Sequence, residues 1–174
     1  AGKGRPFFYF AYGAAVSEVA LDTLTGENRI VAVDILHDVG RSLNPAVDLG
    51  QIEGGFIQGM GWLTTEELWW DHEGRIRTHA PSTYKIPTCS DRPEDMTVRL
   101  WAGGENKEHT IHRSKAVGEP PLMLAISVHQ ALSDAVSSIS GYRHLPSLDA
   151  PATPEALLKA VKIEQARAEN TRIA

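Results

Sequence analysis

The sequence predicts an α+β domain in which helices pack on one face of a mainly antiparallel sheet. Three observations lead to this prediction. Alternating apolar residues over 17–35 indicate a hairpin, apolar side chains over 44–60 recur at helical spacing, and a second helical pattern follows Pro121. The resulting order of strands, helix, strands and helix is typical of an α+β domain.

Strands are predicted for the first part of the chain. Residues 5–15 are rich in Phe and Tyr, which indicates a buried strand. Residues 17–22 alternate between apolar and polar side chains, residues 23–28 supply a turn, and the alternation resumes over 31–35. This pattern predicts an antiparallel hairpin.

The next segment is predicted to be a helix that opens at Asn44 and Pro45. Its apolar face comprises Leu49, Ile52, Phe56 and Met60. The same segment holds Gly54, Gly55, Gly59 and Gly61, and each glycine inside a helix costs about 1 kcal/mol relative to alanine. We therefore expect something to approach this helix backbone closely, either another helix or a bound cofactor.

Shorter elements are predicted for the middle of the chain. Residues 62–70 are expected to form a strand that turns at 71–74 into a second strand over 75–79. A polar loop with proline covers 90–95, and another strand is predicted over 97–101.

Two helices are predicted for the last third. The first follows Pro121, and Gly141 is expected to end it. Its apolar stripe comprises Ala125, Val128, Leu132, Ala135 and Ile139. Thr153 and Pro154 suit the N-cap and first position of a last helix over about 153–166, with a polar tail beyond.

Composition excludes several classes of function. The 174 residues are 42% hydrophobic and carry a net charge of −5, without the basic stripe of a nucleic-acid-binding protein. Apolar runs are too short to span a membrane. The single cysteine, Cys89, cannot form an internal disulfide, and this usage fits a cytoplasmic location. His109 and His112 have no accompanying carboxylate pattern, so we predict no metal ligands in the chain.

The segment Ser114-Lys115-Ala116-Val117-Gly118-Glu119-Pro120-Pro121 carries the strongest chemical signal. Gly118 permits a sharp turn, and Pro120 is expected to hold Glu119 in an extended conformation. The following helix would place Glu119 at its positive end, which favours the anionic carboxylate that a general base requires. The competing interpretation is a favourable end charge with no chemical role.

Three motifs in order extend this observation: Gln51-Ile52-Glu53-Gly54-Gly55-Phe56-Ile57-Gln58-Gly59, then Pro81-Ser82-Thr83-Tyr84-Lys85-Ile86-Pro87, then residues 114–121. Together they resemble the carboxy-terminal part of the molybdenum hydroxylases, the xanthine oxidase and aldehyde oxidase family, and most closely a xanthine dehydrogenase molybdenum-binding subunit. The resemblance runs from about residue 5 to about 161. It implies that residues 1–174 form a single carboxy-terminal fragment of a molybdenum cofactor-binding domain.

The resemblance also implies an activity and its residues. Members of the family hydroxylate an N-heterocycle or an aldehyde at a molybdenum–pterin centre, with water as the oxygen source. Glu119 matches the family's general base, and a carboxylate suits this task because its reference pKa lies well below 7. Gln51 matches a glutamine beside the cofactor, where an amide can both donate and accept hydrogen bonds.

Other interpretations of single residues stay open. Gln51 could instead bond to helix backbone, and Gln58, two turns later, has less support as a cavity residue. Lys115 is interpreted as a solvated lysine or as part of a local ion pair, in preference to an activating charge.

The expected partners are the remainder of the molybdenum subunit, a purine substrate (xanthine or hypoxanthine), and modules that carry FAD and [2Fe-2S]. The isolated fragment is expected to fold but to bind no molybdopterin and to be inactive, because the cofactor lies between segments. The alternatives are a molybdenum hydroxylase for aldehydes or other heterocycles, and a non-catalytic packing or assembly module.

Overall fold

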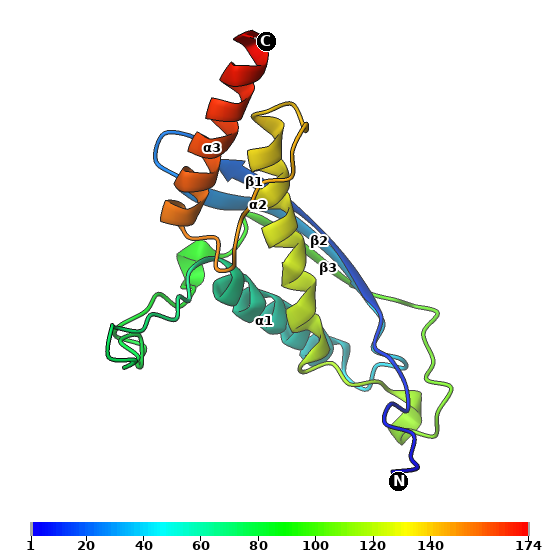
Figure 1. Ribbon diagram of the computed structural model, residues 1–174. Helices are drawn as coiled ribbons and strands as arrows, with labels where there is room; N and C mark the ends of the chain where they lie inside the picture. The colour runs from blue at the N-terminus through cyan, green and yellow to red at the C-terminus, as the bar shows by residue number, and fades with distance from the viewer. Residues whose placement is uncertain (1, 174) are drawn as a thin grey trace.

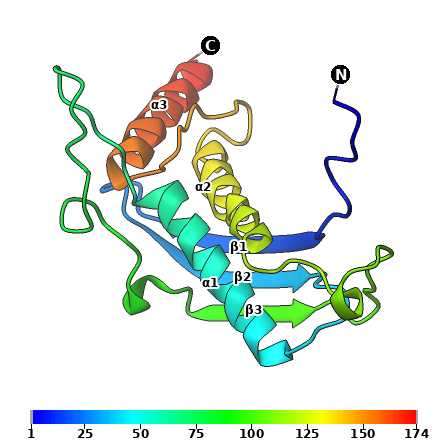
Figure 2. The same cartoon turned by 90° about the horizontal axis from the view of Figure 1, so that it is seen from below.

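A small sheet carries helices on one of its faces in the computed structural model, which describes residues 2–173 (Figure 1). Within this range the sheet has three strands in the order β1-β2-β3, and α1 and α2 cross the same face (Figure 2). The predicted α+β class, with helices packed on one side of a sheet, is confirmed. None of the described helices has the length and apolar character needed to cross a membrane.

The predicted hairpin is confirmed as β1 (Gly13–Leu21) and β2 (Asn28–His37), which pair antiparallel. A third strand, β3 (Asp95–Leu100), lies where a strand was expected over 97–101. It runs parallel to β2, so the sheet is mixed where the sequence predicted a mainly antiparallel one. A parallel neighbour requires a crossover connection, and here α1 and a long loop supply it.

The aromatic segment differs from its prediction. Among residues 2–12 no strand forms, and Phe7, Phe8 and Phe10 are 67%, 63% and 59% exposed. Phe7 and Phe10 stack on each other with ring centroids 6.0 Å apart. Among residues 2–173 no strand lies beside this segment, so its aromatic side chains have no sheet face to cover.

Helix α1 (Pro45–Thr64) begins where predicted, with Asn44 as its N-cap and the Asn44 side chain accepting from the Val47 N–H. It runs further than expected, so the predicted strand over 62–70 is wrong. Leu63 is buried with the apolar face of the helix, which extends the helical spacing by one more turn. The predicted turn at 71–74 is present, but the flanking strands reduce to one bridge between Trp70 and Ile76.

The segment from Pro120 to Ser138 starts as a 3-10 helix, η3 (Pro120–Ala125), and continues as α2 (Ile126–Ser138). Gly141 follows with a φ of +67°, as expected for a glycine that ends a helix. The last helix, α3 (Pro154–Ile173), is capped by Thr153, whose Oγ1 accepts from the Ala156 N–H. It continues past the expected end near 166, in place of the predicted polar tail, and projects from the body (Figure 1).

The hydrophobic core joins all these layers. α1 packs against β3 and α2, α2 packs against β1, and the first turns of α3 close the other end, while β2 contributes buried side chains from the centre of the sheet. The backbone N–H of Ala152 donates to the Leu63 carbonyl at 2.7 Å and ties the start of α3 to the end of α1. The largest fully buried apolar side chains of the hydrophobic core are Val33, Ile35, Val39, Ile52, Phe56, Val128, Leu132, Val136, Leu157 and Val161.

Two of the α1 glycines are explained by the approach of η3. An ideal Cβ on Gly59 would lie 2.4 Å from the Leu122 carbonyl oxygen, and one on Gly55 would lie 3.1 Å from Pro121 Cβ. A neighbouring helix therefore accounts for these positions. Gly50 and Gly54 differ, because nothing lies within 4 Å of a Cβ built on either.

This difference predicts opposite effects of the same substitution. Gly59→Ala should destabilise the chain by about 1–3 kcal/mol, because the added methyl overlaps η3 backbone. Gly54→Ala should stabilise it by up to about 1 kcal/mol, because only helix propensity changes. Urea unfolding of the two variants measures both, and a stabilising Gly59→Ala would contradict the close packing of α1 on η3.

Candidate functional site

The candidate site lies at the bend formed by residues 114–119, between the sheet and η3. Upstream, Ser114 forms a bridge with Gly40, just beyond the end of β2, and the Lys115 N–H donates to the Val39 carbonyl at 2.8 Å. Downstream, the Gly118 carbonyl oxygen lies 3.6 Å from an ideal Cβ on Gly55 of α1. The bend is therefore held at both ends by regular structure.

Glu119 is exposed at the downstream end of this bend. Its backbone is helical, with φ −91° and ψ −39°, so the predicted extended conformation is wrong. The bias that Pro120 imposes is overcome because the Glu119 carbonyl accepts from the Leu122 N–H at 3.1 Å and opens η3. α2 begins only at Ile126, so the dipole next to Glu119 is that of a single short 3-10 helix.

Gln51 lies beside the same bend. It occupies the second turn of α1, and its Oε1 is 3.6 Å from the position of an ideal Cβ on Gly118. The structure thus brings together two residues that the sequence proposed separately, Gln51 and Glu119. Gln58 is exposed further along α1, and no described contact links it to the bend.

Both polar side chains are available for an outside partner. Among residues 2–173 neither the Gln51 amide nor the Glu119 carboxylate has a hydrogen-bond or ion-pair partner, so the alternative in which Gln51 bonds to backbone is not observed. Gly50 and Gly54 leave the α1 surface around Gln51 bare. A group that needs an amide contact and a nearby proton acceptor fits this surface.

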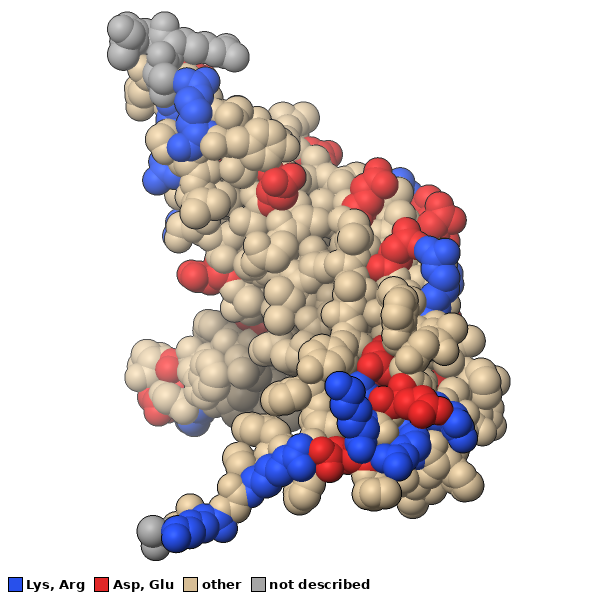
Figure 3. Space-filling model, turned by 90° about the vertical axis from the view of Figure 1, so that its right-hand side faces the viewer, with Lys and Arg blue, Asp and Glu red and all other residues tan. Residues whose placement is uncertain are grey.

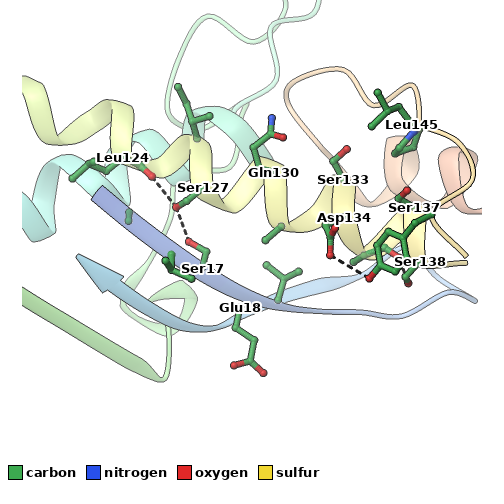
Figure 4. Close-up of a pocket in the computed structure, with 18 of the residues that line it drawn as sticks. Ser17, Glu18, Leu124, Ser127, Gln130, Ser133, Asp134, Ser137, Ser138 and Leu145 are labelled. Carbon is green, nitrogen blue, oxygen red and sulfur yellow. Dashed lines mark hydrogen bonds between the residues drawn. The ribbon is translucent and has the colours of Figure 1, made fainter. Parts of the chain in front are cut away.

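The larger clefts of the molecule lie elsewhere. A trough of about 1180 Å³ runs between β1, α2 and residues 142–146 (Figure 4). Several of its hydroxyl groups bond to protein: Ser17 and Ser127 Oγ are 2.7 Å apart, and Ser127 Oγ also donates to the Leu124 carbonyl. A second cleft of about 820 Å³ lies near Lys85 and Asp91. Neither cleft is lined by Gln51 or Glu119, and we place the chemistry at the bend because the two residues that the sequence motifs single out meet there.

No described group of three or more His, Cys, Asp or Glu side chains is arranged to hold a metal ion. Any group bound at the bend would therefore be held through hydrogen bonds to Gln51 and through the bare surface of α1.

Lys85, in the second sequence motif, has a structural partner. Its Nζ donates to Asp91 Oδ2, which also accepts from the Thr88 N–H at 2.7 Å and from Thr88 Oγ1 at 2.8 Å. The bond from Lys85, followed by that from the Thr88 backbone, lowers the pKa of Asp91 to about 2. These contacts lie within the loop between α1 and β3 and give Lys85 a local structural role.

The protein-family comparison identifies the first half of the chain. Residues 1–93, which include Gln51, match the sequence model of the molybdopterin cofactor-binding domain. The chain belongs to this family. Glu119 lies outside the matched range, although the relatives described next align across most of the chain.

Relatives from vertebrates extend the match. The chain is 50% identical over 161 residues to xanthine dehydrogenase/oxidase from Gallus gallus, which covers 91% of this chain and 12% of that protein. It is 48% identical over 157 residues to aldehyde oxidase 1 from Cavia porcellus, with 88% and 12% covered. The resemblance to the xanthine oxidase and aldehyde oxidase family is confirmed, and the chain spans about an eighth of these relatives.

A solved structure supports the fold. Quinoline 2-oxidoreductase from Pseudomonas putida 86 superimposes with a TM-score of 0.73 at 27% identity, covering 83% of this chain and 18% of that one. These relatives are oxidoreductases, and the chain has the fold of a molybdopterin cofactor-binding domain.

The Lys85 contact yields a prediction that does not depend on catalysis. In Lys85→Met the pKa of Asp91 should rise from about 2 toward its ordinary 3.8, and the two Thr88 bonds should keep it below that value. Because the folded-state pKa is lowered, Asp91 stabilises the wild-type chain above about pH 4, and this contribution is lost as the pH falls toward 2. NMR titration of the Asp91 carboxyl measures the shift, with Lys107→Met as the exposed control. An unchanged Asp91 midpoint would contradict the contact.

Proposed function

We propose that this chain is the carboxy-terminal part of the molybdenum subunit of a xanthine dehydrogenase-type hydroxylase, and that it contributes Glu119 as the general base. The complete enzyme would hydroxylate xanthine or hypoxanthine with water as the oxygen source. The observation that carries the proposal is the placement of the free Glu119 carboxylate and the free Gln51 amide at one bend, among residues 2–173. The similarity to xanthine dehydrogenase/oxidase supports the choice of reaction.

The roles of the two residues follow from their chemistry. When bound, the molybdenum–pterin group supplies the redox and oxygen-transfer chemistry. Glu119 would accept a proton, since a positioned carboxylate is one of the side chains that serve as a general base. Gln51 would hold the cofactor by donating and accepting hydrogen bonds through its amide.

The proposal includes partners that this chain does not contain. The remainder of the molybdenum subunit would supply the other side of the cofactor pocket, and FAD and [2Fe-2S] modules would carry the electrons away. We infer that the isolated chain is inactive and binds no molybdopterin, since one face of α1 and one bend cannot enclose a cofactor. A cytoplasmic location is part of the same proposal.

An aldehyde substrate is the second candidate, because aldehyde oxidase 1 is nearly as similar to the chain as xanthine dehydrogenase/oxidase. The carboxylate at position 119 would serve both reactions equally. Turnover of the complete enzyme with purines and with aldehydes separates the two. A pure packing module is less well supported, because packing does not require an exposed carboxylate on a bend that is held at both ends.

Glu119→Gln in the complete enzyme tests the base directly. The amide keeps the shape of the side chain but cannot accept the proton, so turnover should fall by roughly 100- to 10,000-fold. The control is Glu53→Gln, which changes an exposed carboxylate on α1. Steady-state kinetics per molybdenum, with circular dichroism to verify the fold, measures the effect. A loss of less than about tenfold, or 1.4 kcal/mol in the barrier, would favour the packing module.

Gln51→Met tests cofactor contact. Methionine preserves the length and helix propensity of the side chain but removes the amide, so cofactor retention or turnover should fall by about 10- to 100-fold, as for other residues that orient a metal centre. Gln58→Met makes the same change on the same helix, away from the bend, and should have little effect. Pterin content after dialysis and turnover per molybdenum are the readouts. Equal behaviour of the two variants would remove Gln51 from the site.

A further inference from the structure

We propose that the buried ion pair between Asp38 and Lys115 positions the bend that presents Glu119, an inference that rests on the proposed function. Lys115 Nζ and Asp38 Oδ2 are 2.5 Å apart, and the two side chains are only 8% and 14% exposed. Asp38 directly follows β2, and Lys115 lies four residues before Glu119. The pair therefore joins the end of the central strand to the segment that carries the proposed base.

The Asp38 carboxylate is itself held in place. Its Oδ1 accepts from the Gly40 N–H at 2.8 Å, while its Oδ2 accepts from Lys115 Nζ. Gly104 borders the same oxygen, since an ideal Cβ there would lie 2.3 Å from Asp38 Oδ1. The ammonium of Lys115 also lies 5.1 Å from the centre of the Tyr12 ring, within the range of a cation–π contact.

Hydrogen bonds to Val39, just beyond β2, and to neighbouring segments fix the same stretch. The Lys115 N–H donates to the Val39 carbonyl, and the Ala116 N–H donates to the Tyr9 hydroxyl at 3.1 Å. The Ser114 carbonyl accepts from Thr110 Oγ1 at 2.7 Å and from Asn106 Nδ2 at 3.1 Å. Consecutive residues of the bend are therefore bonded, and only the last residues before η3 lack such contacts.

A buried pair differs from the other ion pairs near this end. Arg41–Glu105 and Arg5–Glu108 involve arginines that are about 60% exposed, and charges of both signs alternate on the surface at the end with the N-terminal segment (Figure 3). Exposed pairs contribute little to stability or geometry. Two charges taken out of water need close mutual contact, so a buried pair tolerates little displacement of either partner.

The neighbouring titratable group, His37, does not disrupt the ion pair between Asp38 and Lys115. His37 is 1% exposed, and its burial lowers the pKa of the imidazole; Lys115 acts in the same direction, whereas Asp38 opposes the shift. A neutral His37 does not compete with Lys115 for the Asp38 carboxylate near neutral pH. The ion pair fixes one end of the bend, and packing on Gly55 and Gly59 of α1 fixes the other.

The test compares variants of the complete enzyme by turnover per bound molybdenum. Lys115→Met keeps the apolar stem but removes the charge, so kcat should fall at least about tenfold while KM changes less, as expected when a catalytic group is displaced. Lys115→Arg keeps the charge and should recover most of the lost turnover. Arg41→Met, which breaks an exposed pair next to the same bend, and Lys107→Met should stay within about twofold of wild type.

A merely structural role makes a different prediction. In that case Lys115→Met would lower yield, Tm and cofactor content, but turnover per bound molybdenum would be unchanged, and this result would overturn the proposal. Failure of Lys115→Arg to recover turnover would also overturn it. If Lys115→Met does not fold, Asp38→Asn removes the other charge with the shape of the side chain preserved. A fall in turnover per bound molybdenum would then support the proposal, and unchanged turnover would overturn it.

Glu119→Gln, measured in parallel, separates this inference from the proposed function. If Glu119→Gln abolishes turnover and Lys115→Met leaves it intact, the positioning role is wrong and the base assignment stands. If Glu119→Gln turns over like wild type, the proposed function is wrong and the positioning role with it.

Discussion

The close packing of α1 on η3 is the contact on which the rest of the arrangement depends. Gly59 lets the η3 backbone approach α1 to a distance that any side chain would prevent, and Gly55 permits a second, slightly looser contact with Pro121. Because η3 continues into α2, the same contact sets how α2 crosses the sheet and how the core between α1, α2 and β2 closes. The residue that opens η3 is Glu119, so the position of its carboxylate is a direct consequence of how two helices pack.

This dependence divides four of the five α1 glycines into two kinds, while Gly61 lies against Pro87. One pair faces η3 and serves packing, whereas Gly50 and Gly54 face open space beside Gln51. Packing cannot account for the second pair, and in a helix each such glycine is unfavourable by about 1 kcal/mol relative to alanine. A helix surface without side chains next to an unpartnered amide would let a ligand approach the helix backbone. The chain belongs to the family of molybdopterin cofactor-binding domains.

Sequence reasoning succeeded where the signal is local. The Asn44 and Thr153 caps and the Gly141 stop follow from residue type at a single position, the hairpin follows from alternation over residues 17–35, and the structure confirms each. It failed where neighbours decide the outcome. The aromatic segment before Gly13 has the composition of a strand but no strand beside it in the described part of the chain, and the parallel addition of β3 depends on a crossover that no local pattern specifies. The Glu119 backbone was mispredicted because one hydrogen bond from Leu122 outweighs the bias of Pro120.

The candidate site shows the same division. Glu119 and Gln51 could be named from their motifs, but their proximity could not, because 68 residues separate them and only the packing of α1 on η3 brings them together. Asp38 was missed entirely: it lies 77 residues from Lys115, and a single acidic residue after a strand has no distinguishing pattern. Its role is visible only when burial and contact are considered together. A bend that carries an exposed acid is held by residues that do not themselves contact the ligand. Which residues hold it depends on tertiary packing. Such residues can therefore be identified from the structure but not from a local sequence pattern.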